Sequence, residues 1–242
     1  ALGFEKQGWP LLGVLVPYTF LIMLSSYELY RRLVMPASFL VVLFYAIYLV
    51  VRNGTISYQK ASGLAMFSGI VIFCFYSFIR LKELLPVEEY GYDAVFFILL
   101  ILCFAWGGDT CAYFAGRAFG KHKLCPVVSP KKTVEGAIGG VLGTMVFGVA
   151  ATLIYSIAAD RMEAFTRSNI GVSMYVVIAL LACVAAVLGI YGDLFASVVK
   201  RQCGIKDYGT IFPGHGGILD RFDSVMFIAP FVTMVITAVF YQ

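Results

Sequence analysis

The sequence predicts an all-α, polytopic membrane protein, and three observations support this prediction. Of the 242 residues, 61% are hydrophobic and only 13% are charged, about half of the ~25% that is usual for a soluble domain. Several apolar runs reach the roughly 20 residues that a helix needs to cross a bilayer. These runs are continuously apolar, whereas a β-barrel strand alternates polar and apolar residues. A soluble helical protein is disfavoured because too few charges remain to coat its surface.

Seven apolar runs are the predicted membrane spans, about seven helices in all. They cover residues 9–29, 34–51, 61–81, 94–118, 134–158, 172–199 and 222–241. Arg31 and Arg32 separate the first two spans, a loop with Arg52 and Lys60 separates the next two, and an acidic stretch that ends at Asp93 precedes the fourth.

Two polar connections distinguish the second half of the chain. Residues 117–135 carry five Lys or Arg and a single Glu, and the loop 200–221 carries four more Lys or Arg. No linker is long enough to separate two domains, so we treat residues 1–242 as one integral membrane domain, with N-terminal membrane helices in 1–105 and a C-terminal half in 106–242 that contains both polar connections.

The charge distribution predicts the orientation. Alternating spans put the loops 117–133 and 200–221 on one side, together with the loop that holds Arg52 and Lys60. That side has eleven of the eighteen Lys and Arg, and the opposite side has seven. The positive-inside rule therefore predicts that both loops are cytoplasmic.

Ionisable residues at membrane depth are costly and are therefore functional candidates. Asp109 lies near the end of the fourth predicted span, in WGGDTCAYFAG, and Asp193 lies inside the sixth, in YGDLFASVVKR. If the second segment is helical, Asp193, Ser197 and Lys200 follow at i, i+4 and i+7 on one face.

Two further acids, Asp220 and Asp223, lie three residues apart at the start of the last predicted span. Carboxylates with water are the ligands that Mg²⁺ prefers, usually shared with substrate phosphates. The alternative is that the pair only caps the last helix. Because Asp109 and Asp193 are predicted on the same side of the membrane, we favour a divalent metal site.

The loop between these acids contains PGHGG, residues 213–217. Its glycines let backbone N–H groups approach an anion, so the loop is a candidate phosphate cradle, with an ordinary turn as the alternative. Basic neighbours favour the phosphate interpretation, although anionic lipid headgroups would also suit them. These neighbours are Lys131, Lys132, Lys200, Arg201, Lys206 and Arg221. His215 is a proton carrier, a phosphate ligand or a simple loop residue, and we do not assign it as a base.

The glycines of VEGAIGGVLG, which follows SPKKT at residues 129–133, are spaced for helix packing. Gly136 with Gly140, and Gly139 with Gly143, both satisfy GxxxG. This spacing predicts close approach of a neighbouring helix.

The segment SVVKRQCGIKDYGTIFPGHGGILDRFDS, residues 197–224, closely resembles the signature of the phosphatidate cytidylyltransferase (CDP-diacylglycerol synthase) family, in its S..KR....KD.....PGHGG..DR.D spacing. The segments WGGDTCAYFAGRAFGKHKLCPVVSPKKTVEGAIGG and YGDLFAS resemble further motifs of that family. The resemblance covers 106–242 and implies that this is the catalytic half. Family members have about nine helices, so seven spans and an initial Ala in place of Met imply that N-terminal helices of the family are absent from this chain.

The resemblance implies that the chain converts CTP and phosphatidic acid to CDP-diacylglycerol and pyrophosphate. It implies Mg²⁺, often with K⁺, and a homodimer in the bilayer of the bacterial inner membrane, with the active site facing the cytoplasm. No nucleic-acid partner is expected.

Transferred residue by residue, the resemblance implies three groups of site residues. The catalytic residues would be Asp193, Asp220 and Lys200, and the acids at the metal would be Asp193, Asp220, Asp223 and Asp109. The substrate-binding residues would be Ser129, Lys131, Lys132, Ser197, Arg201, Lys206, Asp207, Gly214, His215, Gly216, Gly217 and Arg221.

Such a reaction needs no strong base, because a phosphate monoester with a second pKa near 6 is already anionic when it attacks the α-phosphorus of CTP. The enzyme must instead align the reactants and neutralise charge. Two alternatives remain open at this point. An ion transporter would use intramembrane acids without CTP turnover, and a CTP-dependent lipid-alcohol kinase would release CDP and need a base.

Overall fold

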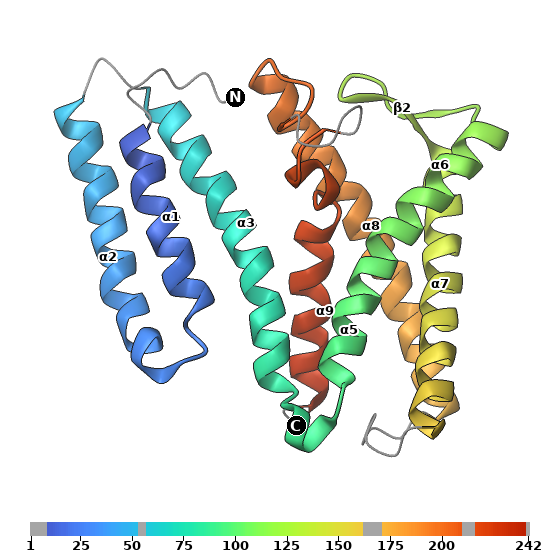
Figure 1. Cartoon of the computed structure of the whole chain (residues 1–242). Coiled ribbons are helices and arrows are strands. Elements are labelled where there is room, and N and C mark those ends of the chain that lie inside the picture. The colour runs from blue at the N-terminus through green and yellow to red at the C-terminus, as the bar shows by residue number, and fades with distance from the viewer. Residues whose placement is uncertain (1–8, 53–56, 162–170, 210–215, 241–242) are drawn as a thin grey trace. The chain divides into compact units, whose positions relative to one another are not determined.

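The computed structural model describes residues 9–52, 57–161, 171–209 and 216–240 (Figure 1). It confirms the all-α prediction, because helices make up nearly all of the regular structure. By contact, the chain divides into two compact units, Ala1–Ile79 and Arg80–Gln242. We describe each unit separately. The division into residues 1–105 and 106–242 predicted from the sequence is a different one, because it separates the half expected to carry the site from the rest of the chain. It stays a prediction.

The first unit consists of α1 (Trp9–Met23), α2 (Glu28–Val51) and most of α3 (Tyr58–Leu84). Leu11 and Leu15 of α1 pack with Ala61 and Leu64 of α3 in a small apolar core. The helix α1 ends six residues before the predicted end of the first span, because the chain turns at residues 24–27, where serine hydroxyls compete with helical hydrogen bonds. Ser25 Oγ donates to the carbonyl oxygen of Ile22 (2.6 Å).

The second unit contains the remaining elements, which Figure 1 shows from green to red. They are the end of α3, α4 (Val87–Tyr90), α5 (Asp93–Leu102), a π-helical turn η2 (Cys103–Gly107), α6 (Gly108–Phe119), β1 (Lys123–Cys125), β2 (Ser129–Thr133), α7 (Val134–Arg161), α8 (Val172–Gln202), a 3₁₀ turn η3 (Leu219–Arg221) and α9 (Val225–Phe240). The elements α5, η2 and α6 form one continuous span of 27 residues.

All seven predicted spans correspond to helices. In the described residues, five are long and apolar enough to cross a membrane, and α1 and the last apolar helix are shorter. The five are Glu28–Val51, Tyr58–Leu84, Asp93–Phe119, Val134–Ala159 and Val172–Gln202. Their length and composition support an integral membrane protein.

The β1–β2 hairpin lies within residues 117–133, which the sequence predicts to be a loop. The strands are antiparallel, and Lys123 pairs with Thr133 and Cys125 with Ser129. Glu135, at the start of α7, accepts hydrogen bonds from the backbone N–H groups of Lys121 (3.1 Å) and His122 (3.2 Å). The hairpin is therefore tied to the first turn of α7.

Close packing of α6 against α7 confirms the prediction from the glycine spacing. A Cβ atom added at Gly139 would lie 2.2 Å from the Cβ of Ala115, and one at Gly143 would lie 2.3 Å from the Cβ of Cys111. The helices approach this closely because glycine has no side chain. This seam of small residues fixes α6, and with it Asp109, against α7.

Candidate active site

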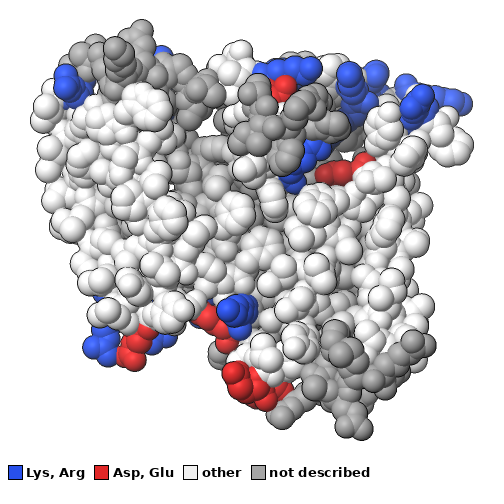
Figure 2. Space-filling view, viewed as in Figure 1, with Lys and Arg blue, Asp and Glu red and all other residues white. Residues whose placement is uncertain are grey.

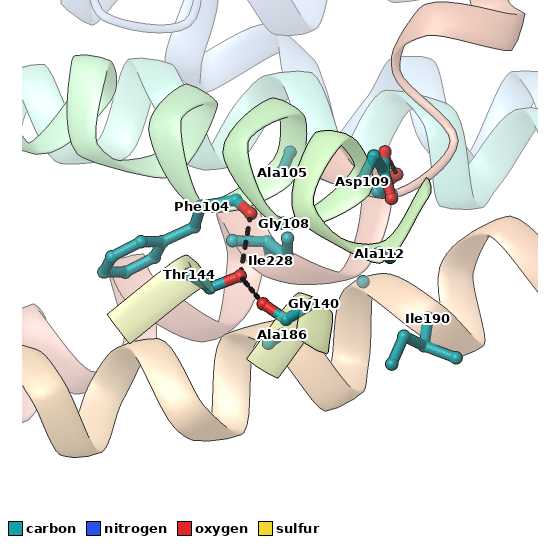
Figure 3. Close-up of a pocket in the computed structure, with 12 residues that line it drawn as sticks. Phe104, Ala105, Gly108, Asp109, Ala112, Gly140, Thr144, Ala186, Ile190 and Ile228 are labelled. Atoms are coloured by element: carbon teal, nitrogen blue, oxygen red, sulfur yellow. Dashed lines mark hydrogen bonds between the residues drawn. The ribbon is translucent and has the colours of Figure 1, made fainter. Parts of the chain in front are cut away.

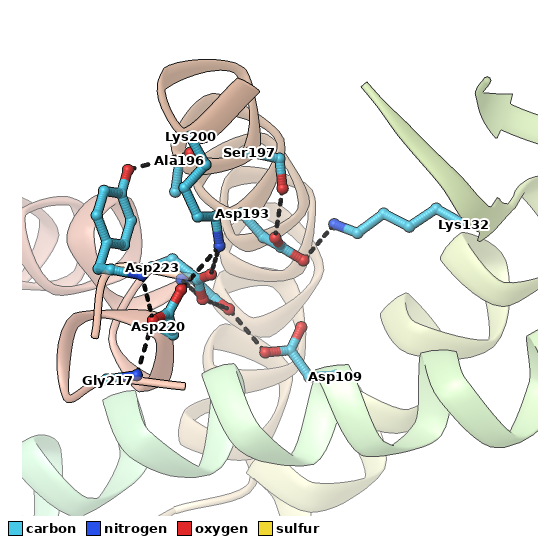
Figure 4. Close-up of polar contacts among 11 residues, drawn as sticks. Asp109, Lys132, Asp193, Ala196, Ser197, Lys200, Gly217, Asp220 and Asp223 are labelled. Atoms are coloured by element: carbon cyan, nitrogen blue, oxygen red, sulfur yellow. Dashed lines mark hydrogen bonds and ion pairs between the residues drawn. The ribbon is translucent and has the colours of Figure 1, made fainter. Parts of the chain in front are cut away.

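Four aspartates and two lysines from separate parts of the sequence meet at one end of the second unit (Figure 4). Asp109 comes from α6, Lys132 from β2, and Asp193 and Lys200 from α8. Asp220 lies in η3, and Asp223 lies between η3 and α9. The end that carries the hairpin also gathers Lys and Arg at its surface, whereas uncharged side chains cover the middle of the unit (Figure 2).

The helix α8 presents two of these charged groups, Asp193 and Lys200, on one face together with Ser197, as their spacing predicts. Ser197 Oγ donates to Asp193 Oδ1 (3.4 Å). Lys132 Nζ, from the hairpin, lies 2.6 Å from Asp193 Oδ2, and both side chains are one quarter exposed. The hairpin thus places Lys132, a predicted phosphate ligand, in contact with Asp193, a predicted metal ligand.

Lys200 forms the most buried ion pair of the site. Its Nζ lies 3.0 Å from Asp220 Oδ1 and 3.8 Å from Asp223 Oδ2. The Lys200 and Asp220 side chains expose only 11% and 7% of their surface. A buried charge needs such a partner because its desolvation is costly.

The carboxylate of Asp220 is also held by backbone groups. Its Oδ2 accepts hydrogen bonds from the N–H groups of Tyr208 (2.8 Å) and Gly217 (2.9 Å). Burial opposes the charge, yet the hydrogen bonds from Gly217, Lys200 and Tyr208 hold the pKa of Asp220 below its ordinary value. Gly216 has a φ of +81°, and a Cβ there would lie 2.9 Å from Asp220 Oδ2. Both the positive φ and the lack of space for a Cβ atom therefore favour glycine at residue 216.

Asp223 has the opposite electrostatic environment. Burial, and then the nearby Asp193 carboxylate, raise the pKa of Asp223 to about 7. Its Oδ1 accepts a hydrogen bond from the N–H of Ser224 (3.0 Å), and Ser224 Oγ donates to Asp109 Oδ2 (2.7 Å). Two acids three residues apart thus differ in charge state near neutral pH.

The start of the last span differs from the prediction. The run was predicted to begin at residue 222, but α9 begins at Val225, and Asp220 lies in the separate turn η3. The side chain of Asp223 satisfies the N–H of Ser224, which competes with continuation of the helix toward its N-terminus. Asp220 and Asp223 therefore do not share a helical face, and they converge instead on Lys200.

The other predicted substrate-binding residues have less defined roles. Gly214 and His215 lie outside the described residues. In the described part of the chain, no hydrogen bond or ion pair joins the four aspartates to Ser129, Lys131, Arg201, Lys206 or Asp207, and all of these except Ser129 are exposed. Arg221 contributes its backbone carbonyl, which accepts a hydrogen bond from Trp106 Nε1 (3.1 Å).

Three residues of the site were not identified from the sequence: Trp106, Ser224 and Tyr208. Tyr208 donates through its hydroxyl to the carbonyl oxygen of Ala196 (3.0 Å), and its ring lies beneath Lys200, 5.2 Å from Nζ. A small pocket lies beside Asp109 and Ser224 and is lined by apolar residues and Thr144 (Figure 3). The sequence offers one indication that Trp106 belongs to the site, its position at the start of the motif WGGDTCAYFAG that contains Asp109.

The site has the donors for a metal, but its acids are paired with lysines. Among the described residues, no group of three or more His, Cys, Asp or Glu is arranged to hold a metal ion. The ammonium groups of Lys132 and Lys200 lie beside the carboxylates instead. The arrangement can bind cations through its oxygen atoms and anions through its lysines.

Comparison with known proteins gives a consistent result. The sequence profile described as "Cytidylyltransferase family" matches residues 4–239. The chain is similar to a phosphatidate cytidylyltransferase of Bacillus subtilis (strain 168), with 32% identity over 224 residues, covering 92% of this chain and 76% of that protein. It is also similar to proteins of the same name from Staphylococcus haemolyticus (39% over 144 residues; 60% and 50% of the two chains) and Staphylococcus epidermidis (42% over 140 residues; 58% and 48%). The matches thus cover about half the length of these staphylococcal relatives.

Proposed function

The chain belongs to the cytidylyltransferase family, and we propose that it transfers the cytidylyl group of CTP to phosphatidate, forming CDP-diacylglycerol and pyrophosphate. One observation supports this most strongly: four carboxylates and two lysines meet at one end of an apolar helical unit. A reaction between two phosphates at a membrane surface requires such a mixture. The family match and the names of the relatives favour cytidylyl transfer to this acceptor over a lipid-alcohol kinase or an ion transporter.

In the proposed reaction, an oxygen of the phosphatidate phosphate attacks the α-phosphorus of CTP. A P–O bond forms there, the bond from the α-phosphorus to the oxygen of the β-phosphate breaks, and its electron pair leaves with pyrophosphate. The attacking phosphate is already largely anionic at neutral pH, so no residue has to remove a proton. Lys132 and Lys200 would bind phosphate oxygens, and charge neutralisation of this kind is a large part of catalysis.

The aspartates fit Mg²⁺, because this ion binds through one or two carboxylates and takes its other oxygens from water and substrate phosphates. Asp193 and Asp220 would hold it, with Asp223 and Asp109 beside them. When bound, Mg²⁺ neutralises phosphate charge. Lys132 and Lys200 are then available to turn from the carboxylates to the phosphates. A role for K⁺ is a further expectation from the resemblance.

We also propose that the protein acts in the bacterial inner membrane, with this site on the cytoplasmic face, and that it forms a homodimer. The excess of Lys and Arg in the loops 117–133 and 200–221 supports the orientation. CTP is a cytoplasmic nucleotide, which requires the same orientation. The dimer rests on the resemblance alone.

A direct assay tests the proposed reaction. The purified chain, reconstituted with phosphatidate, CTP and Mg²⁺, should release pyrophosphate and CDP-lipid in equal amounts, and a chelator should stop both. Asp193→Asn is the matched inactive control. In a parallel reaction with diacylglycerol in place of phosphatidate, release of CDP with a phosphorylated lipid alcohol would support the kinase instead. A folded sample that forms no CDP-lipid from phosphatidate would refute the proposal.

A further inference from the structure

The α5–α6 span holds residues 221–224 at two points. Trp106 Nε1 donates to the backbone carbonyl oxygen of Arg221 (3.1 Å), and its ring meets that of Phe222 edge to face, with centroids 6.2 Å apart. Three residues later in the same span, Asp109 accepts a hydrogen bond from Ser224 Oγ (2.7 Å). The backbone that joins Asp220 to Asp223 therefore lies against this span.

The π-helical turn η2 accounts for this alignment. A π turn contains an additional residue, which rotates all following side chains by about 100° relative to a continuous α-helix. Trp106 lies within the turn, and Asp109 is the second residue after it. On a continuous α-helix with the same buried face of α5, the side chain of Asp109 would be rotated by about 100° from the direction in which it meets Ser224.

The helix α7 supports the turn from the opposite side. Thr144 Oγ1 donates to the carbonyl oxygen of Gly140 (2.8 Å) and lies 3.5 Å from that of Phe104 (Figure 3). A Cβ atom at Gly108 would lie 2.5 Å from Thr144 Oγ1, so this approach requires glycine. The turn is thus packed firmly enough to set the position of Trp106.

Contacts from two sides hold the segment from Asp220 to Asp223. Lys200 and the N–H groups of Tyr208 and Gly217 hold the carboxylate of Asp220 from the side of α8. The indole of Trp106, in η2, holds the carbonyl group of Arg221 from the side of the α5–α6 span. The spacing between the Asp220 and Asp223 carboxylates depends on both.

We propose that Trp106 is a positioning residue whose indole N–H fixes the backbone at Arg221 and thereby sets the spacing of the Asp220 and Asp223 carboxylates for the cation and the substrate phosphates. The inference rests on the proposed function. It also gives the π-helical turn a role, because the turn directs the indole toward Arg221.

The first test compares the two tryptophans of the chain. Trp106→Phe keeps an aromatic ring and removes the N–H donor, and Trp9→Phe makes the same change at an exposed position of the first unit. In reconstituted full-length protein, Trp106→Phe should lower kcat at least fivefold and raise the Mg²⁺ concentration for half-maximal rate at least threefold. Trp9→Phe should change neither by more than twofold. If Trp106→Phe behaves like Trp9→Phe, the proposal is wrong.

The Mg²⁺ dependence separates positioning from simple destabilisation. Loss of folded protein lowers the amount of active enzyme but leaves the half-saturating Mg²⁺ concentration of the remaining enzyme unchanged. A lower rate with unchanged half-saturation would therefore also refute the proposal. Failure of the proposed function looks different, because the unmodified chain would then form no CDP-lipid.

A second measurement requires no change at Trp106. Trp9→Phe leaves Trp106 as the sole tryptophan, so its emission reports the environment of the indole. Adding Mg²⁺ with CTP should change this emission, and Asp220→Asn in the same background should remove the change. Emission that does not respond, in a sample shown to bind CTP, would refute the proposal even if Trp106→Phe fails to fold.

Discussion

Lys200 is the cation that two carboxylates of the site share, and it does so with little exposure to solvent. Removal of one member of a buried ion pair leaves the other charge uncompensated, which typically costs about 3–5 kcal/mol. Lys200 therefore serves the folded state as well as the proposed reaction. Substitution of Lys200 or of Asp220 would confound the two roles, so either variant needs a check that the protein folds. Asp193 is the cleaner target, because its ion pair with Lys132 is one quarter exposed.

Asp193→Asn and Asp220→Asn should each lower the rate of CDP-lipid formation by about 10³-fold or more, which corresponds to about 4 kcal/mol of transition-state stabilisation. Asparagine keeps the size of the side chain but not the charge that the proposed metal needs. Glu89→Gln, an exposed acid in α4, is the control and should retain full activity. Near-normal pyrophosphate release by either aspartate variant would refute its assignment as a metal ligand.

The raised pKa of Asp223 predicts a pH-dependent stability. Its pKa rises from an ordinary 3.8 to about 7 on folding. Between pH 3.8 and about pH 7 the folded protein therefore binds more protons at this residue than the unfolded protein does. The contribution of Asp223 to the free energy of unfolding consequently falls as the pH rises through this range. In the presence of chelator, Asp223→Asn should therefore raise the Tm at pH 8, where the native residue is charged.

The effect of Asp223→Asn on Tm should disappear at pH 5, where the native side chain is already neutral. The lowered pKa of Asp220 acts in both proteins and cancels in this comparison. Thermal unfolding in detergent at the two pH values measures the difference. A shift of equal size at pH 5 and pH 8 would show that charge on Asp223 is not its cause.

At the scale of elements, the seam between α6 and α7 fixes the site. Gly139→Ala should destabilise the protein by roughly 1–3 kcal/mol, because the new methyl group would overlap Ala115. Gly69→Ala is the matched control in α3, where a Cβ meets nothing within 4 Å, and it should stabilise by roughly 0.5–1 kcal/mol. The Tm of the two variants should therefore move in opposite directions. Equal shifts would contradict the packing.

Local patterns in the sequence were sufficient for the elements and for part of the site. Continuous apolar runs predicted the helices, and the spacing of Asp193, Ser197 and Lys200 predicted their common face. Both depend only on the geometry of one helix. The bond from Trp106 to Arg221 joins residues 115 positions apart, and no local pattern carries that information. The π-helical turn depends on packing in the same way.

Asp93 and Asp109 of the α5–α6 span show that the sequence alone could not distinguish a structural acid from an acid of the site. Asp93 begins α5 and Asp109 lies in the first turn of α6, and both border apolar sequence. Asp93 is 1% exposed and accepts a hydrogen bond from Tyr155 of α7 (2.7 Å), far along the span from the site. Asp109 accepts one from Ser224 beside the other acids. Their different roles follow from the neighbouring helices, which the sequence does not reveal.

At the scale of the whole molecule, two native cysteines allow a test of orientation. Cys125 in β1 and Cys203 at the end of α8 lie at the end of the second unit that carries the site, and both are partly exposed. A membrane-impermeant maleimide should label them in inside-out vesicles and not in right-side-out vesicles. Glu88→Cys, in the connection predicted on the opposite side and in a background with Cys125 and Cys203 replaced by serine, should show the reverse. Labelling of Cys125 and Cys203 from outside would overturn the cytoplasmic assignment.

The pairing of lysines with the aspartates also bears on how the protein is made. A nascent membrane protein must be inserted before any nucleotide or metal reaches its site, and uncompensated carboxylates near the bilayer oppose insertion. Lys132 reaches Asp193 from the hairpin, and Lys200 lies between Asp220 and Asp223. Lys132 and Lys200 thus neutralise the carboxylates during membrane insertion and between catalytic turnovers. Once a cation binds the carboxylates, the same ammonium groups become available to the substrate phosphates.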